Sequence, residues 1–347
     1  MNKTVVFLHP HFLKLGGASK VVLEQKSRLD KKGIKCELIY SEVSTGSFRF
    51  WLTFPYFFFK LLIKLNTIPN KIIYCHSIAI YWGYLYKLLY PKTVMIIYFH
   101  DLGFPYFDSE QELNSLGLLP RTLIKLMKPL FFWINRNVIT QADYLIANSN
   151  VSAKFILDKY NRREDLVCTP GVDLKVFKPL GKKQNYVVTV GRLEKIKNID
   201  TTINGFIKYL NNSKSKFVLK IAGVGREKYP YHNQVEFLGN KSPAELAKLY
   251  SEARLGIFMS PFESFGLTAI ECLACGTPII GVNQNGIGEI VKNFNSKYLV
   301  DNSPIVLAQK IVQVINIDNS KQARQAARIY SWDNQVDKLA LWFKSLP

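Results

Sequence analysis

The stretch that decides the fold reads, from Leu255 to Gly281, L-G-I-F-M-S-P-F-E-S-F-G-L-T-A-I-E-C-L-A-C-G-T-P-I-I-G. Its first residues, Leu255–Met259, form an apolar run that predicts a short buried strand, and Pro278–Gly281 predicts the start of the next strand. Between them, apolar residues at helical spacing predict a helix over Gly266–Ala274. The order strand, loop, helix, strand is typical of α/β proteins.

Two carboxylates mark this stretch, Glu263 in the loop and Glu271 on the helix. Their separation of eight residues corresponds to a rise of roughly 12 Å along a helix. One carboxylate can therefore sit at the mouth of the helix and the other along its side. The backbone N–H groups of Phe265, Gly266 and Leu267 are unpaired donors at the helix N-terminus, which favours a phosphate there. Gly266 leaves room for close approach.

The motif E-S-F-G-L-x-x-x-E at 263–271, followed by A-C-G-T-P-I-I at 274–280, resembles the E-x7-E signature of the GT4 family of retaining glycosyltransferases. Matches to other family motifs follow one another along most of the chain. They include A-D-Y-L-I-A-N-S at 142–149, P-G-V-D-L-K-V-F-K-P at 170–179, G-R-L-E-K-I-K-N at 191–198 and N-G-I-G-E-I-V at 285–291. The resemblance implies the α/β GT-B fold, in which two Rossmann-like domains face each other across a cleft.

We expect three segments on this basis. Residues 1–179 form an N-terminal Rossmann-like domain on the acceptor side, and residues 180–330 form a C-terminal Rossmann-like domain for the nucleotide sugar. Residues 331–347 form a C-terminal helix that crosses back to the N-terminal domain. A length of 347 residues independently suits two domains.

The amino-acid composition indicates the cellular compartment in which the protein works. The five scattered cysteines argue against a disulfide framework and favour a reducing compartment. Cys272 and Cys275 spell C-x-x-C, which we interpret as two small buried residues because a second ligand pair for zinc is missing nearby. We see neither a signal peptide nor an apolar run of about 20 residues. We therefore expect a cytoplasmic protein that is peripheral on the inner face of the membrane.

The net charge of +20 favours an anionic partner. Nucleic acid is disfavoured because no zinc-finger or RNP-like motif is present. An anionic membrane surface fits better, since Phe48–Leu65 is rich in aromatic residues and residues 48–100 contain basic but no acidic side chains. Residues 113–142 show the same bias. The alternative for both segments is a helix packed on the domain with a solvated basic edge, and Pro55 disrupts the periodicity of the first.

Candidate site residues of the first domain follow its strands. Lys71–Ser77 and Thr93–His100 are predicted strands that carry His76 and His100 at their carboxyl ends, where open α/β sheets place functional residues. The resemblance implies that His100 orients the donor sugar, with His76 at the edge of the site. Gly16 and Gly17 precede a predicted helix in the form of a phosphate-approach loop.

In the second domain, Arg192 and Lys197 follow the predicted strand Tyr186–Val190. A guanidinium and an ammonium at a strand end suit a diphosphate. The resemblance places Gly223 in a turn beside the nucleotide and brings the backbone of the strand with Phe237 and Leu238 to the base. It also implies that Glu263 and Ser264 lie at the sugar and that Glu271 binds the ribose hydroxyls. The implied catalytic residues are His100, Arg192, Lys197 and Glu263.

The expected reaction is transfer of a hexose-type sugar, with retention, from a UDP- or GDP-sugar to a glycan or lipid-linked acceptor. The sequence contains no D-x-D motif, so we expect no metal and no cofactor, and assign stabilisation of the leaving diphosphate to the cations and helix N-terminus. Two alternatives stay open. One is an enzyme of the same fold that modifies the nucleotide sugar, such as an epimerase, and the other is a non-catalytic basic protein that binds membranes or nucleic acid.

Overall fold

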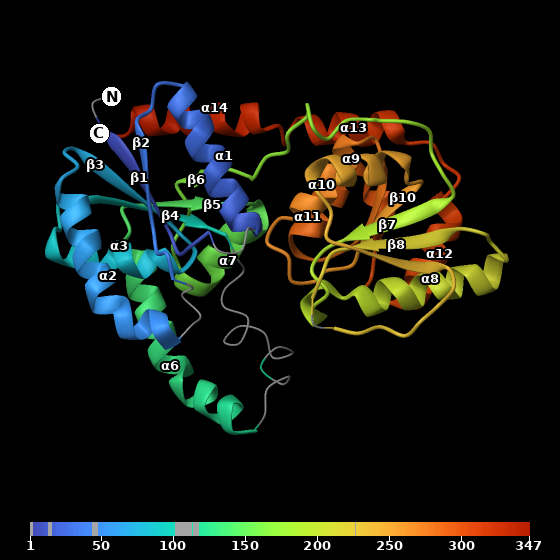
Figure 1. Ribbon diagram of the computed structural model, residues 1–347, viewed down its shortest axis with the longest axis horizontal. Helices are drawn as coiled ribbons and strands as arrows, with labels where there is room; N and C mark the ends of the chain where they lie inside the picture. Colours follow the sequence, from blue (N-terminus) through green and yellow to red (C-terminus); the bar gives the residue numbers. More distant parts are fainter. Residues whose placement is uncertain (1–2, 13–15, 44–47, 101–112, 114–117, 226) are drawn as a thin grey trace. The chain divides into compact units, whose positions relative to one another are not determined.

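The computed structural model describes residues 3–12, 16–43, 48–100, 113, 118–225 and 227–347. The chain divides into two compact units, each described here by itself (Figure 1). Unit 1 consists of Met1–Thr169 and Trp332–Pro347, and unit 2 consists of Pro170–Ser331.

Unit 1 is built on a parallel sheet of six strands in the order β2-β1-β3-β4-β5-β6. Of its central strands, β1 is buried along its whole length and β3 from its second residue onward, and both are mainly apolar, as expected for a parallel sheet covered on both faces. The strands are β1 (Thr4–His9), β2 (Cys36–Tyr40), β3 (Lys71–His76), β4 (Val94–Phe99), β5 (Tyr144–Ala147) and β6 (Leu166–Val167).

Helices cover both faces of this sheet, with α1 and α14 on one face and α2, α3 and α6 on the other (Figure 1). The helix α14 follows unit 2 in the chain and packs on α1, and its Phe343 contacts Tyr74 edge-on at 5.4 Å. The helices are α1 (Gly17–Lys31), α2 (Phe48–Asn66), α3 (Ile80–Leu89), α6 (Leu118–Gln141), α7 (Asn150–Tyr160) and α14 (Trp332–Ser345).

Unit 2 repeats the plan with a second parallel sheet, in the order β12-β11-β10-β7-β8-β9. The strands are β7 (Tyr186–Val190), β8 (Val218–Ala222), β9 (Val235–Gly239), β10 (Leu255–Phe258), β11 (Ile279–Val282) and β12 (Leu299–Val300). The helices are α8 (Ile199–Ser213), α9 (Pro243–Glu252), α10 (Leu267–Ala274), α11 (Asn285–Asn295), α12 (Pro304–Val314) and α13 (Ser320–Arg328). The α/β class and the strands and helix of the opening stretch are confirmed.

The passage 170–179 belongs to unit 2, whereas the sequence placed the domain boundary after residue 179. Phe177 is buried in the core of unit 2, and the backbone of Val172 pairs with that of Ser331. The guanidinium of Arg324 donates to the carbonyl oxygens of Phe177 at 2.6 Å and Leu174 at 3.1 Å. These contacts tie the passage to the second sheet.

Each sheet has one point where the strand order reverses. In unit 1 the chain runs outward from β1 to β2 and then returns to β3 on the other side of β1. In unit 2 the strands β8 and β9 lie on one side of β7, and β10 lies on the other. Ligands of open α/β sheets bind at the carboxyl ends of the strands that flank such a point. The topology therefore singles out the ends of β1 and β3, and of β7 and β10.

Candidate functional site

In unit 2, the predicted cation and carboxylate meet at the point where the strand order reverses. Lys197 lies in a short 3₁₀ turn after β7, and Glu263 lies in the loop after β10. The ammonium of Lys197 donates to the Glu263 carboxylate, and each side chain is about one fifth exposed. The sequence predicted both residues, and the structure brings them together although 66 positions separate them.

Arg192 takes a different position from Lys197. Its side chain is 68% exposed and its guanidinium donates to the carboxylate of Glu194 at 2.9 Å. The long side chain stands on the same β7 loop as Lys197, and this exposed ion pair is its one contact of this kind among the described residues. It is therefore free to turn toward an anion, since exposed ion pairs contribute little to stability.

The loop that carries Glu263 is held by neighbouring elements. The backbone N–H of Gly286 donates to the carbonyl oxygen of Glu263 at 2.7 Å, and the side-chain amide of Asn285 donates to the carbonyl oxygen of Pro261. On the other side, Asn198 donates to the carbonyl oxygen of Met259 at 3.0 Å. The start of α11 and the β7 loop thus fix the loop in place.

Gly286 is needed at the start of α11 because the helix touches the backbone of this loop. A Cβ atom at Gly286 would lie 2.5 Å from both the Cα and the nitrogen of Phe265. Phe265 is itself buried and contacts Tyr330 edge-on at 5.5 Å. The sequence singled out the N-G-I-G-E motif but did not identify this packing role.

Helix α10 begins directly after the loop, as predicted. Its N-cap, Gly266, has a φ of 115°, which L-residues with side chains rarely adopt, and a Cβ atom there would lie 2.6 Å from the side chain of Ile287. Glycine is thus required for backbone shape and packing, which adds to the room it was expected to leave for a phosphate. Glu271 lies along α10, as the spacing predicted, and the structure shows that it is only 5% exposed.

The C-x-x-C pair is confirmed as a buried pair. Cys272 and Cys275 have free thiols that are at most 1% exposed, and burial raises the pKa of Cys275 to about 12. Across the described ranges, no group of three or more His, Cys, Asp or Glu side chains is arranged to hold a metal ion.

The turn after β8 approaches the β7 loop closely. Gly223 has a φ of 141°, and a Cβ atom there would lie 1.9 Å from the carbonyl oxygen of Gly191. Leu193 and Gly225 form a backbone bridge beside it. Phe237 and Leu238 lie on the predicted strand β9, and the ring of Phe237 stacks on Tyr229 at 5.9 Å. Gly223 therefore lies beside the cation loop, and β9 presents a partly exposed aromatic ring.

In unit 1, three histidines gather at the ends of neighbouring strands. His9 ends β1, His76 ends β3 and His100 follows β4, and all three are at most 8% exposed. The ring nitrogens His76 Nδ1 and His100 Nε2 lie 2.8 Å apart, and His9 Nε2 lies 3.1 Å from the hydroxyl of Ser19. Sequence reasoning found His76 and His100 but missed His9, although its position at a strand end was the same signal.

Burial keeps these histidines neutral. Desolvation, with help from nearby imidazoles, lowers the pKa of His9 to about 4 and of His100 to about 3, and lowers the pKa of His76 well below its ordinary value. His76 Nε2 is buried and has no hydrogen-bond partner among the described residues. A proton there would leave a buried N–H unpaired, so we assign the proton to Nδ1, from which it is donated to His100 Nε2. His100 then carries its own proton on Nδ1.

Gly16 and Gly17 lie where the expected phosphate loop meets its helix. Gly16 is the N-cap of α1, both glycines are exposed, and a Cβ atom at Gly16 would have open space around it. Ser19, in the first turn of α1, contacts His9 at the end of β1. The start of α1 is thus joined to the histidine cluster. Residues 13–15 of the same loop lie outside the described residues.

The predicted aromatic segment is a continuous helix, α2, with Pro55 inside it. Phe57 and Phe58 pack against the core, and Phe57 lies 4.7 Å from Trp82. An outer stripe of α2 is exposed at intervals of three or four residues: Leu52, Tyr56, Phe59 and Ile63. Each of the two interpretations of this segment, packed helix and exposed apolar surface, therefore describes one face of α2.

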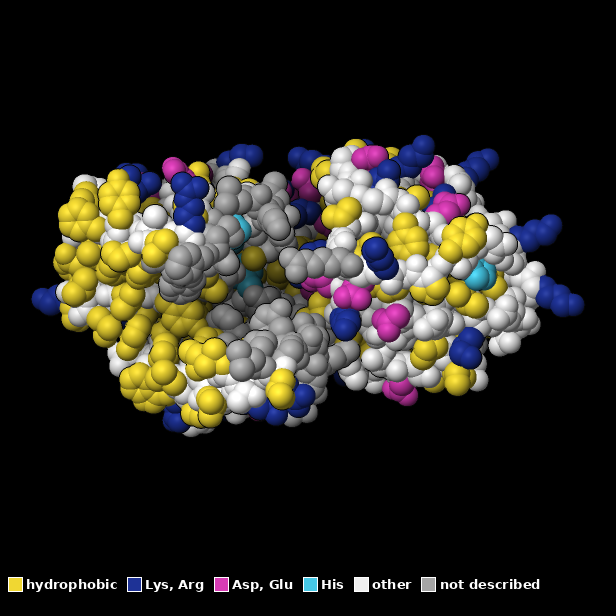
Figure 2. All heavy atoms as spheres, turned by 60° about the horizontal axis from the view of Figure 1, so that its bottom comes forward, with side chains coloured by type: hydrophobic (Ala, Val, Ile, Leu, Met, Phe, Trp, Pro, Cys, Tyr) yellow, Lys and Arg dark blue, Asp and Glu magenta, His cyan; other side chains and the backbone are white. Residues whose placement is uncertain are grey.

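A second exposed apolar stripe runs along α6, and Figure 2 shows hydrophobic side chains gathered over unit 1. Its members are at least 47% exposed: Leu123, Leu126, Met127, Leu130 and Trp133. Contiguous apolar surface of this kind marks an interaction site. None of the described helices combines the length and apolar content that crossing a membrane requires.

Residues 173–332 match the family model described as glycosyl transferases group 1. Among curated relatives, the D-inositol 3-phosphate glycosyltransferase of Gordonia bronchialis is 29% identical over 241 residues, which cover 59% of this chain and 52% of the relative. That of Mycolicibacterium smegmatis is 30% identical over 231 residues, covering 59% of this chain and 53% of the relative. The chain spans about half the length of these relatives.

Solved structures resemble the whole chain. Sucrose-phosphate synthase from Thermosynechococcus elongatus has a TM-score of 0.79 at 17% identity, with 99% of this chain and 98% of that chain covered. Anabaena HepE, in complex with UDP and glucose, has a TM-score of 0.73 at 18% identity, with 99% of both chains covered. These likenesses confirm the expected GT-B fold class.

Proposed function

We propose that this chain, whose residues 173–332 match the glycosyl transferases group 1, transfers a sugar from a nucleotide-diphosphate donor. The observation that carries the proposal is the contact between Lys197 and Glu263 at the switch point of the second sheet. The ammonium suits the diphosphate and the carboxylate suits sugar hydroxyls. Because the sugar is bonded to the distal phosphate, one donor molecule presents these two groups at adjacent positions.

The remaining donor contacts follow from the same geometry. The exposed guanidinium of Arg192 turns from Glu194 to the diphosphate, with bidentate hydrogen bonds. The start of α10 at Gly266 directs N–H groups at the phosphates, and Glu271 accepts hydrogen bonds from the ribose. UDP is supported as the nucleotide by the complex of Anabaena HepE, whose likeness to this chain is one of fold.

For the reaction, we propose retention without a metal. The bond between the anomeric carbon and the diphosphate breaks, the acceptor oxygen bonds to the same face of the sugar, and the acceptor hydroxyl gives up its proton to the departing diphosphate. Arg192, Lys197 and the N-terminus of α10 stabilise the charge that develops on the leaving diphosphate, which agrees with a sequence that lacks D-x-D. His100, neutral at the end of β4, orients the sugar.

For the acceptor, we propose a lipid-linked substrate at an anionic membrane surface on the inner face. The support is the pair of exposed apolar stripes on α2 and α6, together with the positive charge of the chain. We propose a role for the protein in the assembly of glycoconjugates or surface polysaccharides.

The test is nucleotide release from UDP-, GDP- and ADP-sugars in EDTA, with Arg192→Ala and Glu271→Ala as variants. Slow release from one donor that both variants lose is the expected result. Release of a changed sugar nucleotide, with no hydrolysis, would indicate an epimerase. If calorimetry detects no binding of any nucleotide by the wild-type protein, the transferase proposal fails and the basic binding protein becomes the better description.

A further inference from the structure

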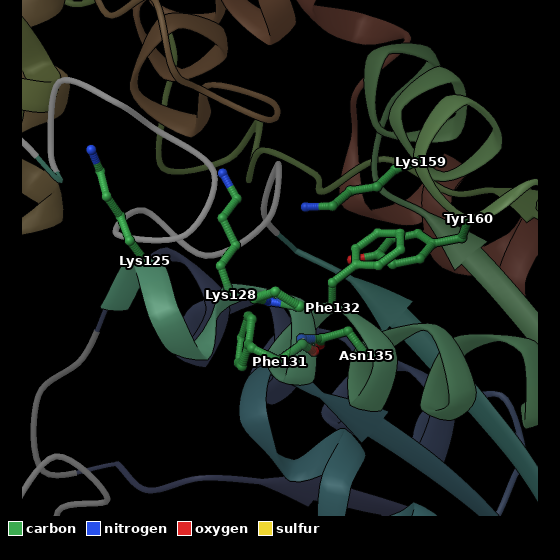
Figure 3. A pocket seen from close by; sticks show the side chains of 8 residues that line it. Lys125, Lys128, Phe131, Phe132, Asn135, Lys159 and Tyr160 are labelled. Carbon is green, nitrogen blue, oxygen red and sulfur yellow. The ribbon is translucent and has the colours of Figure 1, made fainter. Parts of the chain in front are cut away.

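A pocket of about 320 Å³ lies between α6 and α7, and its described lining residues include neither the histidines of unit 1 nor Lys197 and Glu263. Three lysines and three aromatic residues line it, together with a proline and an asparagine (Figure 3): Lys125, Lys128, Pro129, Phe131, Phe132, Asn135, Lys159 and Tyr160. Among the described lining residues, none is acidic. The pocket combines an apolar floor with cations at its mouth.

The floor is rigid because its side chains are fixed by specific contacts. Phe132 of α6 stacks on Tyr160 of α7, with ring centroids 6.0 Å apart and an interplanar angle of 11°. Asn135 is buried, donates to the carbonyl oxygen of Phe131 at 2.8 Å and accepts from the hydroxyl of Tyr81 at 2.8 Å. The pocket is thus formed without a ligand.

The lysines surround the opening from two helices. Lys125 and Lys128 are exposed on α6, and Lys128 and Lys159 extend on the same side of the Phe132 ring in Figure 3. The ammonium of Lys159 lies over the rings of Phe155 at 5.0 Å and Tyr160 at 5.7 Å. No salt bridge joins Lys125 or Lys128 to an acid in the described part of the chain. Among the described residues, these two cations therefore have no ion-pair partner.

The apolar stripe of α6 adjoins this pocket. Lys125 and Leu126 are consecutive, so their side chains point about 100° apart around the helix axis. The same relation holds for Phe132 and Trp133. A molecule whose anionic group enters the pocket can thus lay an apolar chain along the exposed stripe formed by Leu126, Leu130 and Trp133.

We propose that this pocket binds the phosphate headgroup of an anionic membrane lipid. Lys128 and Lys159 contact the phosphate, Phe131 and Phe132 contact the first carbons of the lipid, and the α6 stripe continues the contact with the acyl region. A nucleic-acid phosphate fits less well because the surface beside the pocket is apolar. The inference rests on the membrane contact in the proposed function and is independent of sugar transfer.

The test is calorimetric titration of the full chain with dihexanoyl phosphatidic acid below its micellar concentration. Dihexanoyl phosphatidylcholine and inorganic phosphate serve as comparison ligands. We expect one phosphatidic acid per chain, and the double variant Lys128→Gln/Lys159→Gln to weaken binding about 30-fold, at about 5-fold for each lysine near a charged lipid surface. Lys128→Glu, at an exposed position, should weaken it further without disturbing packing.

The matched control is Lys35→Gln/Lys154→Gln, which removes the same charge from exposed positions of unit 1 that do not line the pocket. It should change the affinity less than 2-fold. Equal losses in both double variants, or no loss in either, would overturn the proposal. Binding of inorganic phosphate as tight as that of phosphatidic acid would show an anion site without lipid specificity.

Two further readouts separate this inference from the proposed function. UDP titration of the same samples checks the donor site, and the Lys128 and Lys159 variants should leave it unchanged. The wild-type protein could bind vesicles of mixed phosphatidylglycerol and phosphatidylcholine without binding soluble phosphatidic acid. That result would support the proposed membrane surface and contradict the proposed headgroup pocket.

Discussion

At the scale of single residues, we propose that His76 is a positioning residue for His100. Its only described polar partner is His100 Nε2, at 2.8 Å, and aromatic rings enclose it on its remaining sides: Phe7, Tyr74 and Tyr98. His76→Phe removes the hydrogen bond that fixes which ring nitrogen of His100 carries the proton. We expect it to lower kcat about 10-fold, with a smaller change in the KM of the donor. Nitrogen chemical shifts of the His100 ring report the tautomer directly.

The matched variant for this prediction is His76→Asn, whose amide nitrogen stands close to the position of Nδ1. It should restore the ¹⁵N shifts of His100 and most of kcat. If His76→Phe leaves the His100 shifts unchanged, the hydrogen bond does not set the tautomer, and His76 is only a packing residue.

The lowered pKa values of His9 and His100 also predict how stability depends on pH. Each residue is neutral when folded and has a pKa near 6.5 when unfolded, so the unfolded chain binds more protons as pH falls. Stability should be complete above pH 6.5 and decline below it, continuing toward the folded values of about 4 and 3. At pH 5 each histidine should contribute a loss of about 2 kcal/mol.

Urea unfolding of wild type and His9→Asn at pH 7.5 and pH 5 measures this effect. The variant removes one of the titrating groups, so the difference between its two stabilities should be smaller than that of the wild type. If wild type and variant lost equal stability between pH 7.5 and pH 5, His9 would have to be protonated in the folded protein at pH 5.

At the scale of elements, the start of α11 supports the Glu263 loop. Gly286→Ala places a Cβ atom 2.5 Å from the backbone of Phe265, whereas Gly288→Ala, two positions further on, meets its nearest atoms at 3.3 Å. We expect the first variant to displace the loop and weaken UDP-sugar binding at least 10-fold, and the second to weaken it less than 3-fold. Calorimetry with the donor compares them, and similar affinities would show that α11 does not position the site.

The same elements show how far the sequence predicts this structure. Apolar runs such as Thr4–Leu8 and Tyr186–Val190 predicted strands well, because parallel strands buried on both faces leave an uninterrupted signal. The segment with Pro55 was harder to interpret. Its helix is apolar on both an inner and an outer face, so the apolar residues do not recur at the clear helical spacing that a helix with one apolar face shows.

Parts of the site could not be predicted because they depend on tertiary contacts. The eight-residue spacing predicted the loop and helix positions of Glu263 and Glu271, and the G-R-L-E-K motif identified Lys197. The pairing of Lys197 with Glu263, and of His76 with His100, depends on which strands become neighbours. No local pattern encodes that, and the role of Gly286 against Phe265 is equally non-local.

At the scale of the whole molecule, the exposed stripe of α2 leads us to expect that substitutions can weaken membrane binding without lowering the stability of the fold. Tyr56→Ser/Phe59→Ser replaces two exposed rings, whereas Phe57→Ser/Phe58→Ser replaces two rings that pack on the core. We expect the first variant to lose vesicle affinity at least 10-fold with an unchanged Tm, since it removes only apolar surface that faces outward. The second should lower the Tm by several degrees, because the lost core packing reduces the free energy of unfolding by about 2–5 kcal/mol.

Sedimentation with anionic vesicles and thermal unfolding of the same preparations measure the two effects. Unchanged vesicle affinity in Tyr56→Ser/Phe59→Ser would remove α2 from the membrane face. The apolar stripe of α6 would then be tested alone.

The division of the chain between the two units has a consequence for biosynthesis. Unit 2 is one continuous segment, Pro170–Ser331, while unit 1 is completed by α14, whose Trp332, Leu339 and Phe343 are buried. At elongation rates of about 5–20 residues per second, unit 2 takes roughly 10 to 30 s to translate. For that interval the nascent first sheet lacks the helix that covers one of its faces. The unit that emerges second from the ribosome is therefore the first that can finish folding.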